Sequence, residues 1–389
     1  MTRLVLAGLV GRSPDWLKKI ENGTRRLNSL PMLVRISQVL DVPDLAELAG
    51  TDHPAPVEAW DGEVHHVVPA IRQAMREVSF PLPDDRLAMT PDHLQQTVRR
   101  LWILWHTSAH QRTDVGRELP SLIRQAHATI RRHDGEDRRR ARAATGDLYR
   151  LVQRLLAHIS ERELHALAVE RGRAMSEDAD TPLSLALAAW SSSVSLCAAG
   201  HYHDATQLAD AGVGYLTPLL NSGARSGQVI GTLGALQLES AAAHGLAGRQ
   251  GDAFRLLDAA HATASRMPAN AWHEQSGFER SGVQILSVIV ASCLHRYGDA
   301  LTQAARIAPD SPPSVVRSSR LLLEEAHAHT QKTDYNSAVR ALTAAADTST
   351  EAVALIPWAR ELADELVVNT SGGIRMEAST LAARLKSVR

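Results

Sequence analysis

Apolar residues recur along nearly the whole chain at the three- and four-residue spacing of an amphipathic helix. Glycine and proline interrupt this pattern and leave helical stretches of roughly 12 to 25 residues. No run of four or more alternating β-branched residues competes with it. The pattern therefore predicts an all-α protein.

The first fifty residues contain short helices with well-marked ends. Ser13 is a good N-cap, Pro14 suits the first helical position, and Gly11 suits a tight turn before them. The region then predicts helices over 3–10, 13–22 and 29–40, with a helical turn over 45–48. Pro54, Pro56 and Gly62 mark residues 51–68 as a connector.

The rest of the chain, 69–389, contains an irregular repeat. The segments 199–212, 247–260, 294–307 and 332–345 align on one alanine each, and three of them carry tyrosine three residues earlier. The aligned alanines are Ala205, Ala253, Ala300 and Ala338, and the tyrosines are Tyr202, Tyr297 and Tyr335. We expect a helix–turn–helix pair at each segment, with the alanine at a close helix crossing and the tyrosine packed into the next pair.

This turn pattern resembles the tetratricopeptide repeat, whose usual period is about 34 residues. The spacings here are longer, at 48, 47 and 38 residues. The resemblance implies a tetratricopeptide-like α-superhelical domain with extended helices. An unrelated α-helical bundle is the alternative.

The distribution of charge, the cysteine content and the length of the apolar runs indicate which classes of protein fit the chain. The net charge is −1, but residues 1–35 carry +5, so the positive charge lies with the first helices. The two cysteines, Cys197 and Cys293, form no CxxC motif, and we expect them as small buried residues in a reducing cytoplasm. The longest apolar run, 283–294, is too short to cross a bilayer.

Residues 2–50 resemble the Cro/repressor-type helix-turn-helix domain of the Xre family. Ala7, Gly11, Leu17 and Ile20 follow the packing pattern of two crossing helices, and "ENG", "TRR" and "ISQVLDVPDLAELAG" match the family. The resemblance implies that 13–22 is a recognition helix for double-stranded DNA.

The resemblance also implies the DNA-binding residues. Lys19 suits a guanine edge, Asp15 suits cytosine, and the arginines suit phosphates at a helix N-terminus or in a loop. The expected set is Arg12, Ser13, Asp15, Lys18, Lys19, Asn22, Arg25 and Arg26. A solvated surface is the alternative for the basic members. We expect Trp16 to pack in a core or between domains, and Glu21 to hydrogen-bond within the domain.

The family has one more helix before the helix of Ala7, and Met1 leaves no room for it. Two interpretations stay open: the natural chain starts further upstream, or the domain has lost DNA binding. In either case we expect Leu4, Leu6, Leu9 and Val10 to be poorly covered and the domain to be less stable than its relatives.

The whole chain resembles actinobacterial Xre-family regulators with tetratricopeptide-like C-terminal halves. The resemblance implies a transcription regulator that binds a two-fold operator as a homodimer and senses a peptide, a small molecule or a protein partner in the groove of the repeats. Asn221, Asn270, Asn336 and Asn369 are candidates to hold a peptide backbone, with turn and cap roles equally open to them. The alternative function is an interaction scaffold with a degenerate helix-turn-helix.

No pattern indicates an enzyme, a cofactor or a metal site. The chain has no GxGxxG, P-loop or GxSxG motif, and its 18 histidines lack metal-ligand spacing. Trp102 and Trp105 share a helix face and are expected in the core. The charged run 131–142 is expected as a solvated helix turn.

Overall fold

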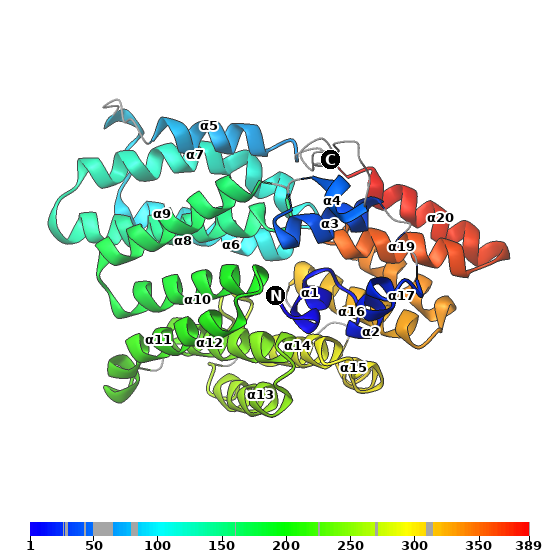
Figure 1. The fold of residues 1–389 in the computed structure, drawn as a ribbon. Coiled ribbons are helices and arrows are strands. Elements are labelled where there is room, and N and C mark those ends of the chain that lie inside the picture. Colours follow the sequence, from blue (N-terminus) through cyan, green and yellow to red (C-terminus); the bar gives the residue numbers. More distant parts are fainter. Residues whose placement is uncertain are drawn as a thin grey trace.

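The computed structural model describes residues 1–25, 27, 30–42, 44–49, 65–78, 85–159, 161–224, 226–268, 271–308 and 314–388. These residues are mostly helical and form no β-sheet, which confirms the all-α prediction (Figure 1). Most of the expected connector, residues 51–64, lies outside the described residues, as do Arg26 and Asn270.

The first helices end within a residue of their predicted positions, because local residues fix their caps. The Ser13 side chain accepts a hydrogen bond from the backbone N–H of Trp16, and Gly11 takes the positive φ of 70° that its turn requires. The helices are α1 (Arg3–Leu9), α2 (Pro14–Glu21), α3 (Leu30–Leu40) and α4 (Leu45–Ala49).

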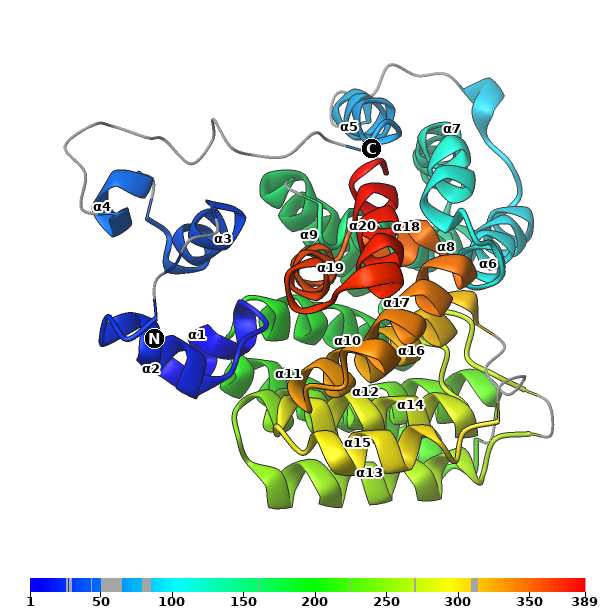
Figure 2. The same ribbon diagram turned by 90° about the vertical axis from the view of Figure 1, so that its right-hand side faces the viewer.

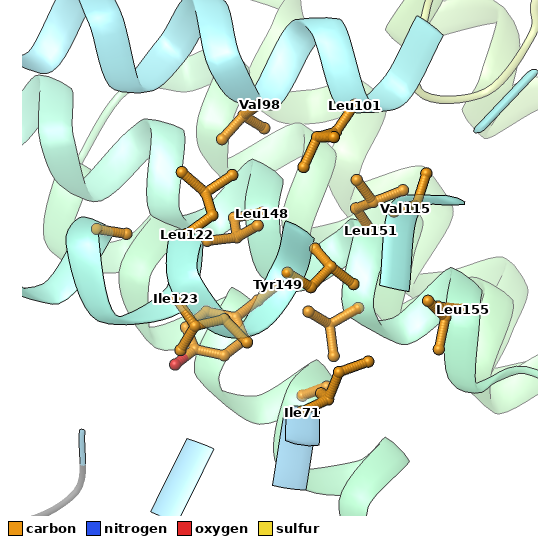
Figure 3. Close-up of a cluster of buried hydrophobic side chains, with 14 of the residues drawn as sticks. Ile71, Val98, Leu101, Val115, Leu122, Ile123, Leu148, Tyr149, Leu151 and Leu155 are labelled. Carbon is orange, nitrogen blue, oxygen red and sulfur yellow. The ribbon is translucent and has the colours of Figure 1, made fainter. Parts of the chain in front are cut away.

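The next helices form a bundle with its own apolar core (Figure 3). Ile71, Leu122, Ile123, Leu148 and Tyr149 interdigitate there and are almost fully buried. The elements are α5 (Val68–Glu77), a 3₁₀ turn (Asp85–Leu87), α6 (Pro91–Thr107), α7 (Gln111–Arg132), α8 (Gly135–Leu156) and α9 (Arg162–Ala179). Trp102 is part of this core, as expected. The run 131–142 covers the end of α7, a short connection and the first turns of α8, and it is mostly exposed, although Ala141 is buried.

Four helical hairpins follow, and each predicted repeat segment lies at one of their turns. The pairs are α10 (Pro182–Ala198) with α11 (Tyr202–Asn221), α12 (Gly227–Leu246) with α13 (Gln250–Ala264), α14 (Arg280–Cys293) with α15 (Tyr297–Ala304), and α16 (Val315–Gln331) with α17 (Tyr335–Thr348). The four aligned alanines are all buried in the second helix of their pair. Tyr297 packs on His327 of the next hairpin as predicted, whereas the Tyr202 hydroxyl faces Gly8 of α1.

The last helices of the chain pack near the first helices of the bundle. They are α18 (Thr350–Ala354), α19 (Pro357–Asn369) and α20 (Gly372–Lys386). Helix α16 contacts α6, and α18 contacts α7. The Glu351 carboxylate of α18 accepts hydrogen bonds from the backbone N–H of Arg112, at 2.9 Å, and from both the backbone N–H and the hydroxyl of Thr113. The helices thus close around a central space.

A loop between α13 and α14 inserts against two glycines of α12. The backbone of His273 and Phe278 pairs in an isolated bridge, and both side chains are fully buried. A Cβ atom on Gly231 would lie 2.5 Å from His273 Cβ, and one on Gly234 would lie 2.0 Å from Phe278 Cζ. Only glycine at these two positions allows the loop to lie so close to the helix.

We predict that Gly234→Ala destabilises the protein by about 1–3 kcal/mol, because the added methyl group overlaps the Phe278 ring. Urea denaturation measures the change. Gly214→Ala is the matched control, since Gly214 also lies within a helix but an added Cβ atom there would point into open space. It should be neutral or up to about 1 kcal/mol stabilising. Equal effects of the two variants would contradict the close packing.

Stability should fall as the pH is lowered from about 6.5 to 4, in part because of His273. Burial lowers the pKa of His273 to about 4, so the unfolded chain takes up a proton that the folded chain refuses. The loss from this residue reaches up to about 3 kcal/mol at the lower end. Urea denaturation at several pH values should show a shallower dependence for His273→Gln, and an unchanged slope would contradict this assignment.

Candidate functional site

The predicted recognition helix presents most of its expected DNA-binding residues on an exposed surface. Asp15, Lys18, Lys19 and Asn22 are all exposed, and Arg25 follows them in an exposed turn. The Lys19 ammonium lies 2.7 Å from the Asp15 carboxylate, which lowers the pKa of Asp15. Ser13 serves as the N-cap of α2.

Trp16 and Glu21 are used within the N-terminal helices, as predicted. Trp16 packs against a small core formed by Val10, Met32 and Ile36. The guanidinium groups of Arg12 and Arg25 lie 5.5 Å and 6.0 Å from the centre of its ring. Glu21 accepts a 2.8 Å hydrogen bond from Arg3 of α1.

The prediction that α1 is poorly covered is wrong, because α3 covers Leu6 and Val10, and the helical hairpins cover Leu4 and Leu9. Val10 is fully buried, and Leu4, Leu6 and Leu9 are half-buried. A Cβ atom on Gly200, in the α10–α11 turn, would lie 2.7 Å from Leu9 Cδ1. One on Gly248, in the α12–α13 turn, would lie 2.9 Å from Leu4 Cδ2. Helix α1 therefore packs across two hairpin turns (Figure 2).

Arg12, expected at a DNA phosphate, instead points toward α19. Its guanidinium lies 2.9 Å from the Glu365 carboxylate and 3.7 Å from that of Glu361, and its side chain is only 20% exposed. Arg35 of α3 also faces Glu361 and donates a 2.9 Å hydrogen bond to the carbonyl of Leu9. In this arrangement Arg12 joins the N-terminal helices to the C-terminal ones and is unavailable to a phosphate.

An aromatic ladder supports the same junction. The rings of His295, Tyr297, His327 and Trp358 make successive edge-to-face contacts with centroids 5.4–5.9 Å apart. A Cβ atom on Gly11 would lie 3.0 Å from Trp358 Cβ, so the turn between α1 and α2 rests on the end of the ladder. A small cavity of about 130 Å³ lies between these rings and α1.

A larger cavity of about 370 Å³ occupies the centre of the closed stack. Helices from the bundle, the hairpins and α18 contribute to its wall, and Trp105 and Trp190 supply two aromatic surfaces. Leu246 and Arg320 line both this central cavity and the smaller cavity beneath α1. The two spaces are therefore neighbours with a shared wall.

Two of the arginines that line the central cavity have their hydrogen-bonding groups satisfied by protein. Arg112 donates to the carbonyls of Leu155, Ala157 and Glu351 and lies over the Trp105 ring. Arg320 is paired with Glu324, with a 2.8 Å hydrogen bond, and lies 5.5 Å from the centre of the Trp358 ring.

The other two arginines of the wall form no salt bridge with a carboxylate among the described residues. Arg154 stacks over Trp190 at 5.3 Å, and Arg317 donates a hydrogen bond to the backbone carbonyl of Ser276. Glu239 is the one acidic residue of the cavity wall, and burial raises its pKa.

Sequence reasoning missed this cavity. Its arginines are far apart in the chain, and only Arg317 and Arg320, three residues apart on one amphipathic helix, offered a signal. Trp105, expected in the core, lines the cavity while being 5% exposed. The cysteines, expected as small buried residues, also lie on cavity walls, and burial raises their pKa, that of Cys293 to about 12.

The asparagines considered for a peptide lie elsewhere. Asn221 and Asn369 are the last residues of α11 and α19, and Asn336 is in the first turn of α17. All three are exposed and none lines either of these two cavities. Their helix-end positions fit the cap and turn roles.

We predict that Arg12→Ala loosens α1 from the hairpins. Loss of a mostly buried ion pair costs about 1–2 kcal/mol, which corresponds to roughly ten-fold faster amide exchange in α1. Hydrogen exchange read by mass spectrometry measures this. Arg3→Ala is the control on the same helix, since its pair with Glu21 is about half exposed and should contribute little. Equal exchange in both variants would show that the pair does not hold the junction.

No helix in the described part of the chain is long and apolar enough to cross a membrane. No protein-family model matches the chain, and neither a curated protein nor a solved structure shows significant similarity to it.

Proposed function

We propose that the protein is a DNA-binding transcription regulator of the Xre type, whose tetratricopeptide-like stack senses a ligand in its central cavity. The observation that carries this proposal is the position of the N-terminal helices. Their basic surface on α2 is exposed, while α1 and Arg12 rest on the helices that enclose the cavity. A homodimer on a two-fold operator follows from the same family resemblance.

Arg320 provides a physical link between the cavity and α2. Arg320 lines the central cavity, pairs with Glu324 and stacks on Trp358. Trp358 in turn contacts Gly11, in the turn between α1 and α2. A ligand that draws Arg320 toward the central cavity changes the surface on which Gly11 rests. The stability of the docked N-terminal helices then depends on the ligand.

A second function, an interaction scaffold without DNA binding, is favoured by one observation. Arg12 is engaged with Glu365 and Glu361, so this arrangement withholds one of the expected phosphate contacts. In that case the exposed lysines of α2 would be a solvated surface.

DNA binding separates the two functions. We predict that the chain binds a labelled pool of DNA from upstream of its own gene, with affinity that falls steeply with salt. Lys18→Ala/Lys19→Ala should lower the affinity at least ten-fold and reduce the slope of log K against log salt by about 2. Fluorescence anisotropy measures both quantities.

The chain offers a matched control because it has only four lysines. Lys332→Ala/Lys386→Ala removes the other two, which are exposed near the ends of α16 and α20. This variant should bind as the unaltered chain does. Equal losses in the two double variants would indicate non-specific attraction, and no binding at low salt would favour the scaffold.

A further inference from the structure

The central cavity carries more positive charge than its own residues balance. Of its four arginines, Arg112 and Arg320 interact with Glu351 and Glu324, which lie behind the wall. Within the described structure neither Arg154 nor Arg317 forms a salt bridge; Glu239 faces both of them, and Glu279 also lies near Arg317. On the cavity wall itself, Glu239 is the one carboxylate beside these two guanidinium groups.

The electrostatic consequences appear at neighbouring groups. Burial and the charges of Arg154 and Arg320 lower the pKa of Arg317 to about 10. His158, also on the cavity wall, has its pKa lowered to about 3 by burial and by Arg112, Arg320, Arg35 and Arg154. Burial is the largest cause of both shifts, and the contribution of the neighbouring arginines adds to it. That contribution reflects a positive potential in the cavity, which favours an anion.

The volume of the cavity and the apolar residues of its wall indicate what the occupant contains besides an anionic group. The volume of about 370 Å³ lies in the range of small-molecule sites and far exceeds that of a single phosphate or sulfate. Trp105 and Trp190 line the cavity together with aliphatic side chains such as Leu238, Leu286 and Ile289. An occupant that fills this space therefore needs an apolar body as well as a charge.

We propose that the central cavity binds a small organic anion, with its carboxylate, phosphate or sulfonate group between Arg154 and Arg317 and its apolar body against the two tryptophans. The planar guanidinium group suits these anions because it donates two parallel hydrogen bonds. This inference rests on the proposed function, since it names the ligand class of the same cavity.

Unpartnered polar atoms on the wall agree with an absent ligand. Gln111 Nε2 and Ser319 Oγ belong to buried residues that line the cavity, and neither atom has a hydrogen-bond partner among the described residues. Buried polar groups are normally paired, so these two atoms are available to form hydrogen bonds with an occupant of the cavity.

A matched pair of fluorescent probes tests the charge requirement. 8-Anilinonaphthalene-1-sulfonate has an aromatic body and a sulfonate, and N-phenyl-1-naphthylamine has the same aromatic body without the charge. We expect the sulfonate to bind the folded chain at one site, with a dissociation constant at least ten-fold lower than that of the neutral probe. Equal affinities would overturn the proposal.

Substitutions of the two cavity arginines test whether the sulfonate binds in the central cavity. Arg154→Gln and Arg317→Gln should each weaken sulfonate binding at least ten-fold and leave the neutral probe unaffected. Arg340→Gln, at an exposed arginine on α17, is the control and should change neither. Unchanged sulfonate binding in both cavity variants would overturn the proposal.

Thermal unfolding separates a lost site from a lost fold. Without a probe, Arg154→Gln should melt at close to the temperature of the unaltered chain, because it removes one of four like charges around the cavity and also loses the stacking contact with Trp190. With the sulfonate present it should melt lower than the unaltered chain, since bound ligand stabilises the fold. A lower melting temperature without any probe would mean that Arg154 is a structural residue and would overturn its role as an anion ligand. None of these measurements uses DNA, so failure of the DNA-binding proposal leaves their outcome unaffected.

Discussion

The closed shape of this protein depends on Glu351. Its carboxylate accepts the backbone N–H groups of Arg112 and Thr113, which lie in the first turn of α7. The N-cap residue of α7, His110, forms no side-chain hydrogen bond with these N–H groups. A carboxylate at a helix N-terminus meets both the free N–H groups and the positive end of the helix dipole. A residue 239 positions away in the chain thus completes the helix and holds the last helices against the first bundle.

Arg112 extends this interaction to a second helix. Its guanidinium donates to the carbonyls of Leu155 and Ala157 at the end of α8. Carbonyls at a helix C-terminus lack partners within the helix, and a cation satisfies them and favours the negative end of the dipole. The Arg112–Glu351 contact therefore satisfies two helix ends at once, and it brings together the walls of the central cavity.

The sequence predicted the features that residues close together in the chain determine, namely helix ends and the helix crossings within a hairpin. Ser13 and Gly11 mark the ends of α1 and α2 within their own few residues, and the repeated alanines mark helix crossings inside single hairpins. It did not predict contacts between distant segments, such as Glu351 with α7 or Phe278 with Gly234, because no local pattern encodes them. The same reason explains Arg12 and Leu9. The local pattern predicts residues 1–50 as a separate domain, whereas in the structure the side chains of Arg12 and Leu9 pack on α19 and on a hairpin turn.

The closed arrangement of the helices also limits how the number of hairpins can change in evolution. An open solenoid tolerates gain or loss of a repeat, since each unit touches only its neighbours. Here an added or deleted hairpin would rotate α16 and α18 away from α6 and α7 and leave the N-terminus of α7 without its carboxylate. The number of hairpins is thereby fixed by geometry, and variation in this architecture is confined to loop lengths and to the side chains that line the cavity.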